Sequence, residues 1–239
     1  MSSGKKLNVY GDQAIHKQGR FGHDIASQRL DDLDRAFVRF LLDFPGAGTA
    51  TTDKSNRKPV VADLGCGEAR VGFLAAILGA RVHLVDVLDI MGRLTALRMV
   101  TESVDVVFHH ESATDFAIRL DERVDAIYSQ RFIHYLRFPD ADAMIRVLTE
   151  KMVPGSRLFL SASGLGSELG ERYPCATHPV ENRFAPLDAS MAAKHNIHGP
   201  VCLYTLDDME KLVLPHGLRT IQIQASPFGN VKAVFEKII

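Results

Sequence analysis

The sequence predicts an α/β protein with a mostly parallel sheet, and three observations support this. Short apolar runs rich in β-branched residues recur along the chain, as expected of strands buried on both faces of a parallel sheet. Segments with apolar residues at three- and four-residue spacing separate these runs, as expected of connecting helices. A glycine-punctuated turn joins the first run, residues 60–63, to a helical segment that begins near Ala69. Strand, tight turn and helix therefore follow one another at the start of the sheet.

The apolar pattern places seven strands, at residues 60–63, 81–86, 104–108, 124–129, 157–162, 218–224 and 231–237. Helices are expected at residues 25–44, 69–78, 90–101 and 140–151, and from Thr205 to about 215. The last two strands are joined by a short turn, so we expect them to be antiparallel. Two irregular elements complete the pattern: a polar loop at residues 111–116, in which Asp115 is a candidate local helix cap, and a turn at Pro154-Gly155 before the fifth strand.

The chain divides into four segments by composition. Residues 1–57 form an N-terminal helical or lid segment, 58–163 the core, 164–203 an inserted cap, and 204–239 a helix and strand pair that complete the core. The cap is rich in Gly, Pro, His and Asn, and an irregular stretch of that length is uncommon in a compact domain unless it has a function. We expect it to cover the ligand site beyond the fifth strand.

Composition limits the classes of function. The formal net charge of the 239 residues is −1, so no overall basic field attracts nucleic acid or an anionic membrane. No apolar stretch approaches the roughly 18 residues of a membrane span. The three cysteines cannot all pair, which favours a reducing, cytoplasmic setting.

The turn after the first strand is a candidate site for a nucleotide cofactor. Gly65 and Gly67 allow a sharp bend and close approach of a ligand to the backbone. The second strand ends at Asp86, 19 residues after Gly67, where a carboxylate can accept hydrogen bonds from both hydroxyls of a ribose. A dinucleotide loop is disfavoured, because Arg70 stands where a third glycine is needed and Asp63 would repel a diphosphate. Asp63 suits a ligand with a cationic end.

The run Asp63-Leu64-Gly65-Cys66-Gly67, followed by Asp86, resembles the cofactor loop and ribose-binding acid of class I S-adenosylmethionine (SAM)-dependent methyltransferases. The resemblance covers residues 58–163 well and 204–239 fairly. It implies a Rossmann-like, doubly wound, seven-stranded sheet that is mostly parallel with an antiparallel last strand, carrying an inserted cap after strand five. It also implies SAM as the cofactor. The cofactor-binding residues expected on this basis are Arg20, Asp63, Gly65, Cys66, Gly67, Asp86, Val87, Ser112, Ala113 and Ser129.

The residues after the fourth strand are expected to face the acceptor, because sheets of this kind bind ligands beyond the carboxyl ends of their strands. The candidate substrate residues are Gln130, Arg131, Tyr173 and Tyr204. His134 is the candidate general base, weighed against a hydrogen-bonded packing histidine among apolar neighbours. No metal site is expected, because the spacing of His195, His198 and Cys202 matches no standard zinc set.

These expectations favour a SAM-dependent methyltransferase that transfers a methyl group to a small-molecule acceptor by in-line displacement. Two alternatives stay open: methylation of a protein or RNA, and a SAM-binding regulatory protein without transfer activity. Ser129-Gln130-Arg131-Phe132 differs from the motif of nucleic-acid amino-methyltransferases, so DNA is not an expected partner. We expect no membrane partner, and a monomer or homodimer.

Overall fold

A computed structural model describes residues 30–45, 57–100 and 104–238 and contains a seven-stranded sheet of order β3-β2-β1-β4-β5-β7-β6. β7 runs antiparallel to β5 and β6, and the pairs among β1 to β5 are parallel. The predicted seven strands and antiparallel last strand are therefore confirmed. The strands are β1 (Val60–Leu64), β2 (Arg81–Asp86), β3 (Asp105–His110), β4 (Val124–Gln130), β5 (Met152–Ala162), β6 (Leu218–Ala225) and β7 (Val231–Lys237).

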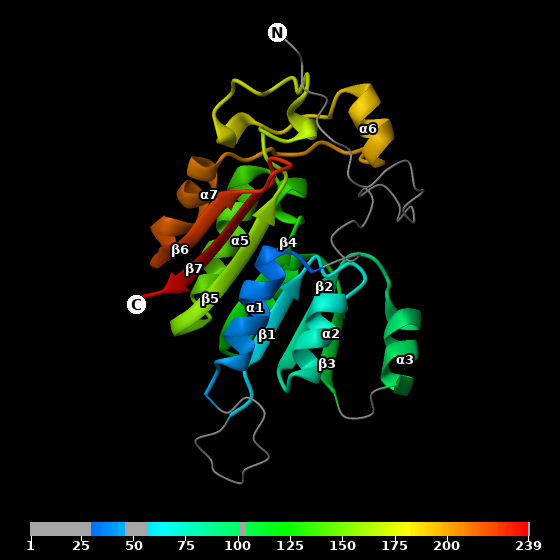
Figure 1. Ribbon diagram of the computed structural model, residues 1–239, viewed down its shortest axis with the longest axis vertical. Coiled ribbons are helices and arrows are strands. Elements are labelled where there is room, and N and C mark those ends of the chain that lie inside the picture. The colour runs from blue at the N-terminus through cyan, green and yellow to red at the C-terminus, as the bar shows by residue number, and fades with distance from the viewer. Residues whose placement is uncertain (1–29, 46–56, 101–103, 239) are drawn as a thin grey trace.

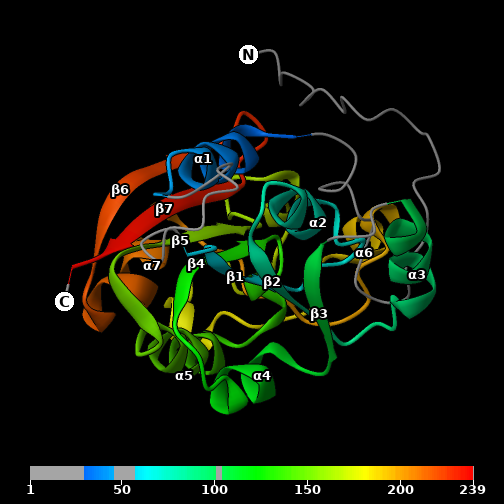
Figure 2. The same ribbon diagram turned by 90° about the horizontal axis from the view of Figure 1, so that it is seen from below.

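Helices cover both faces of the sheet (Figures 1 and 2). One face packs against α1 and α2, and the other against α4, α5 and α7. The α-helices are α1 (Asp32–Leu42), α2 (Arg70–Ile77), α3 (Met91–Val100), α4 (Ala113–Arg119), α5 (Phe138–Thr149), α6 (Ala189–His195) and α7 (Leu206–Val213). Short 3₁₀ turns are η2 (Ile133–Tyr135), η3 (Glu168–Gly170), η4 (Val180–Asn182) and η5 (Leu214–His216). The strand order reverses between β1 and β4, which is where such sheets bind ligands.

α1 is fixed to the sheet by one aromatic residue and one buried acid. Phe37 is fully buried, with its ring centroid 4.8 Å from that of Tyr128 and 5.2 Å from that of Phe159. The hydroxyl of Tyr128 donates to the buried carboxylate of Asp34. Asp31 and Asp34 form a capping box, so α1 begins at Asp32 and the prediction of one helix from residue 25 was wrong. Residues 25–29 lie outside the described part of the chain.

Residues 113–119 form a helix where a polar loop was predicted. Ser112 is the N-cap of α4, and its Oγ accepts from the backbone N–H of Asp115 at 3.1 Å. Asp115 is therefore not the cap, and its carboxylate instead accepts from the Ser112 hydroxyl at 2.6 Å. The apolar side of α4 carries the buried Phe116, whose packing against the sheet stabilises a helix too short to show a clear periodic pattern.

The turn predicted at Pro154-Gly155 lies inside a longer strand. β5 begins at Met152, which pairs with Val124, and the register then shifts so that Ala126 pairs with Arg157. Gly155 has φ +86° at this irregularity. A bulge of this kind accepts a proline because it frees the residue from donating to the ladder. The predicted turn at Pro154-Gly155 is thus an irregularity within β5, whose pairing with β4 begins before it.

Residues 164–203, which we call the cap, lie beyond the end of the sheet toward which the parallel strands point (Figure 1). Its two ends are clamped together: Tyr204 N donates to Ser163 O, and Leu165 N donates to Tyr204 O, each at 3.0 Å. The cap also has a small apolar cluster of its own, made of Leu169, Tyr173, Leu187, Ile197, Val201 and Leu203. The expected irregular stretch is therefore a folded segment with its own core.

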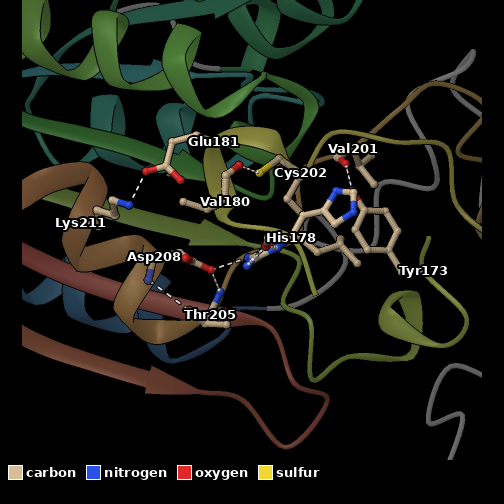
Figure 3. A network of polar contacts seen from close by, with 11 residues as sticks. Tyr173, His178, Val180, Glu181, Val201, Cys202, Thr205, Asp208 and Lys211 are labelled. Atoms are coloured by element: carbon tan, nitrogen blue, oxygen red, sulfur yellow. Dashed lines mark hydrogen bonds and ion pairs between the residues drawn. The ribbon is translucent and has the colours of Figure 1, made fainter. Parts of the chain in front are cut away.

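A buried arginine anchors the cap to α7. The Arg183 guanidinium donates to Leu203 O at 2.9 Å, to His178 O at 2.8 Å and to the Asp208 carboxylate at 2.5 Å. Asp208 also accepts from the backbone N–H of Thr205 in the capping box that begins α7. Figure 3 shows Asp208 and Thr205 beside His178, and Glu181 paired with Lys211 in the same region.

Replacing Arg183 with alanine is expected to lower the free energy of unfolding by about 3 kcal/mol, because it leaves Asp208 buried without its cation. Arg172→Ala is the matched control. It removes a cap arginine whose side chain is 68% exposed and pairs with Asp188, so it should cost less than about 1 kcal/mol. Urea denaturation of both variants measures the difference, and equal costs would contradict the anchoring role.

The Asp208 pair is also expected to make stability depend on pH. Burial alone would raise the pKa of Asp208, but hydrogen bonds from Thr205 and Arg183 outweigh it and lower the pKa. A folded-state pKa below the unfolded value of about 3.9 stabilises the protein above that pH, and the contribution is lost as the pH falls through the lower value. The stability advantage of the wild type over Asp208→Asn should therefore shrink on acidification below about pH 4. A constant advantage, measured by denaturation across that range, would be the contrary result.

Candidate functional site

The loop between β1 and α2 is bent across the end of β2. The backbone N–H groups of Gly65 and Cys66 both donate to Val85 O, at 2.9 and 3.1 Å. Gly65 and Gly67 have φ of +64° and +51°, the left-handed region that glycine adopts at least cost. The predicted pair of glycines therefore makes the sharp bend that was expected of it.

Asp86 stands at the end of β2 with its carboxylate oriented by the backbone. Oδ2 accepts from the N–H of Gly67 at 2.8 Å, and Oδ1 accepts from the N–H of Leu88 at 2.9 Å. Each carboxylate oxygen has two lone pairs, so one on each oxygen remains after these bonds. The arrangement can accept two further hydrogen bonds from neighbouring hydroxyl groups, as a ribose presents.

Asp63 faces α2, and this corrects its predicted role as a direct partner of the ligand. It is 3% exposed, and its Oδ2 accepts from Gly72 N at 3.1 Å. The N-cap residue of α2, Ala69, provides no side-chain cap, so Asp63 satisfies a first-turn N–H from the neighbouring strand. A Cβ on Gly72 would lie 2.7 Å from this carboxylate, which explains why a glycine stands there.

Negative charge surrounds the glycine loop. Burial raises the pKa of the Cys66 thiol well above its usual value, and the carboxylates of Asp63 and Asp86 raise it further. The Cys66 thiol is therefore protonated at neutral pH and is not a nucleophile. The same field favours a cationic ligand group and opposes a diphosphate.

Val87, Ser112 and Ala113, predicted to lie around an adenine, flank the ends of β2 and β3. Val87 is 49% exposed directly after Asp86, and Ala113 is buried in the first turn of α4. The Ser112 hydroxyl is committed to Asp115, as described above, so it is not a free donor. These three adenine contacts stay predictions. The predicted Arg20 lies outside the described residues.

Ser129, Gln130 and Arg131 end β4 beside the loop, as predicted, but they differ in their partners. Ser129 is fully buried, and its Oγ has no partner among the described residues. The Gln130 amide donates to the Asp31 carboxylate at 3.1 Å, so it braces the N-cap of α1. Arg131 adopts φ +58°, and its guanidinium contacts the Ser163 hydroxyl at 3.3 Å.

His134 is a packing histidine, and its predicted role as general base is not supported. The side chain is buried on η2, and Nδ1 accepts from Ser163 N at 3.4 Å, which leaves the proton of the neutral ring on Nε2. Burial, followed by the charge of Arg131, lowers the pKa of His134 well below its usual value. Its only basic nitrogen is thus already engaged by the backbone.

Tyr173 and Tyr204, predicted to line the substrate site, are structural. The Tyr173 hydroxyl donates to Val201 O and accepts from Ala185 N within the cap cluster. Tyr204 is fully buried in the core cluster beneath the cap. Both are aromatic residues in or next to the cap, which is the reason that the sequence suggested them. Their orientation is set by packing against residues distant in the sequence.

The sequence reading missed two features at this end of the sheet. Phe132 packs on the glycine loop, where a Cβ on Gly65 would lie 2.6 Å from Phe132 Cβ. The second feature is a pair of serines at the end of β5, Ser161 and Ser163, which both contact Arg131. Their close spacing in the sequence was the available signal.

Among the described residues no group of three or more His, Cys, Asp or Glu side chains is placed to hold a metal ion. His195 pairs with Glu168 at 3.2 Å and His198 with Asn196 at 2.9 Å, while the Cys202 thiol faces Val180 O. None of the helices in the described ranges is long and apolar enough to span a membrane.

Comparison with known proteins agrees with this geometry. Residues 61–155, which include the loop, Asp86 and the end of β4, match the model of a methyltransferase domain. The sheet order with its reversed β7 is that of the same class. The chain has the fold of the class I SAM-dependent methyltransferases, and its core is similar to a methyltransferase domain.

The curated relatives match this chain over the core. Ubiquinone biosynthesis O-methyltransferases from Xanthomonas oryzae pv. oryzae and Xanthomonas campestris pv. campestris are each 31% identical over 101 residues. The match covers 42% of this chain and 41% of each relative, so the chain spans about two fifths of the relatives it matches.

Solved structures match over most of the chain at low identity. The 1,6-didemethyltoxoflavin-N1-methyltransferase of Burkholderia thailandensis has a TM-score of 0.60 at 17% identity, covering 90% of this chain and 82% of that one. The magnesium protoporphyrin IX methyltransferase of Synechocystis PCC 6803 has a TM-score of 0.56 at 16% identity, covering 86% and 81%. These likenesses show the shared fold.

The three cysteines of the chain are expected to differ in reactivity. Cys66 and Cys202 should alkylate slowly at neutral pH, because burial raises the pKa of both thiols, that of Cys202 to about 12. Cys175, which is half-buried in the cap, should react first. Mass spectrometry of the native protein during iodoacetamide treatment gives the order, and early labelling of Cys66 would contradict the raised pKa of its thiol.

Proposed function

We propose that this chain binds SAM across the ends of β1, β2 and β4 and transfers its methyl group to a small-molecule acceptor. The observation that carries the proposal is the Asp86 carboxylate, oriented by Gly67 N and Leu88 N with one lone pair left on each oxygen. In this assignment Asp86 holds the ribose hydroxyls, and the backbone of the glycine loop borders the adenosine and methionine parts. When bound, SAM supplies a methyl group on a cationic sulfur.

The charge around the loop supports SAM over a dinucleotide. The Asp63 and Asp86 carboxylates act together on Cys66, so the loop is electrically negative. A sulfonium is stabilised there, whereas the diphosphate of a dinucleotide is repelled. Arg70 opens α2 where a dinucleotide loop needs its third glycine.

Methyl transfer depends more on the positioning of the acceptor than on a general base. Alignment of acceptor and methyl supplies most of the rate expected of such a transfer. This agrees with His134, whose basic nitrogen is engaged by Ser163 N. An acceptor whose attacking atom carries a proton would need to be acidic itself, or would need a base other than His134. The cap lies over the carboxyl ends of the strands, where it can keep water from the acceptor (Figure 1).

A small molecule is the favoured acceptor class on two grounds. The relatives named above carry names of enzymes that act on ubiquinone precursors, a toxoflavin precursor and a porphyrin. The cap, folded around its own apolar cluster, lies beyond the strand ends, where an acceptor would have to enter, and this favours a small acceptor over a macromolecule.

Replacing Asp86 with alanine is expected to weaken SAM binding by about 1.5–3 kcal/mol, the range for hydrogen bonds to a charged group. This corresponds to roughly a 10- to 150-fold rise in Kd. Calorimetric titration of wild type, Asp86→Ala and the control Asp121→Asn measures it, because Asp121 is exposed and distant from the loop. Wild type that binds a nicotinamide dinucleotide but not SAM would contradict the proposal.

The acceptor class is tested by methyl transfer from radiolabelled SAM. We expect label in low-mass metabolites of a cell extract, and little in the protein or RNA fractions. Label confined to protein or RNA would establish the macromolecular alternative. SAM binding without transfer to any fraction would favour a regulatory protein.

A further inference from the structure

Arg131 is a strained arginine at the end of β4. Its φ of +58° is unusual for a residue with a side chain, and such strain often marks a functional position. The conformation is held from β5, because Arg131 N donates to both the backbone O and the side-chain Oγ of Ser161, at 3.0 Å each. The backbone therefore directs the Arg131 side chain beyond the strand ends, at a cost in conformational strain.

The guanidinium of Arg131 has no anionic partner among the described residues. The guanidinium donates to the neutral Ser163 hydroxyl at 3.3 Å, which uses one of five N–H donors. Other arginines of this region pair with acids: Arg172 with Asp188, and Arg183 with Asp208. A partly buried cation without a counter-ion is unfavourable, so a ligand anion would complete this site.

The groups near Arg131 do not neutralise its charge. Burial, and after it the charge of Arg131, lowers the pKa of His134, and burial together with the charge of Arg131 lowers the pKa of His195 in α6. Glu168, the acid that contacts His195, is shared between His195 and Lys194. The acid nearest to His195 is therefore already paired.

We propose that Arg131 binds a carboxylate of the methyl acceptor. The proposal rests on the proposed function and names the chemical class of its acceptor. A guanidinium matches a carboxylate in both charge and two-point geometry, whereas a phosphate dianion would keep one charge unpaired. The guanidinium contacts Ser163, which follows β5. β5 lies three strand spacings, about 14 Å, from β2, the strand that ends at Asp86.

The test compares a carboxylate probe with its neutral isostere. Binding of benzoate and benzamide is followed by ligand-observed NMR with S-adenosylhomocysteine present, in wild type and in Arg131→Gln, Arg131→Lys and Arg172→Gln. Arg172→Gln is the matched control, because Arg172 also has a positive φ, 55°, but pairs with Asp188 at the surface. Thermal denaturation verifies folding, and Arg131→Asn replaces any Gln variant that does not fold, because Asn tolerates this conformation.

We expect wild type and Arg172→Gln to prefer benzoate by about tenfold or more, as one charge-assisted contact provides. Arg131→Gln should abolish the preference, Arg131→Lys should keep part of it, and the Kd for SAM should stay unchanged in all variants.

Three outcomes overturn the proposal: no preference in wild type, a preference that survives Arg131→Gln, or a large loss of SAM affinity in Arg131→Gln. The last would assign Arg131 to the carboxylate of the cofactor. Failure of wild type to bind SAM would instead refute the proposed function, so the two failures are distinguishable.

Discussion

The structure depends on the hydrogen bonds that tie the glycine loop to the end of β2. Gly65 and Cys66 donate to Val85 O, and Gly67 donates to Asp86. These bonds fix the direction in which the chain leaves β1. The Asp63 carboxylate then accepts a hydrogen bond from the backbone of the first turn of α2. Strand, loop, acid and helix are thus coupled, so a ligand held by Asp86 meets a loop that is already in place.

Asp63 shows how one buried charge can serve two purposes. Its carboxylate satisfies a helix N–H that the N-cap residue leaves open. The same charge contributes to the negative potential at Cys66, although the side chain faces the helix and not the ligand. Electrostatic support of a cationic ligand does not require direct contact, because an incompletely screened charge acts over several ångströms.

The sequence was sufficient for the parts of the fold that local pattern determines. Buried strands of a parallel sheet are continuous apolar runs, so β1, β2 and β4 and the loop with Asp86 could be predicted. Tyr173 and Tyr204 were wrongly placed at the substrate site, because their burial depends on residues that folding brings near. Pro154-Gly155 marked the irregularity correctly, but its place inside β5 could not be predicted, because it depends on the pairing of Met152 with β4.

The clamped ends of the cap have a consequence for how this protein can diversify. Ser163, Leu165 and Tyr204 bring entry and exit of the segment to one point, joined by backbone hydrogen bonds. An insertion anchored in this way behaves as a module: it can be lengthened, shortened or exchanged while β5 and α7 keep their positions. Under the proposed function, acceptor preference can therefore change through this segment while the glycine loop and Asp86 are kept.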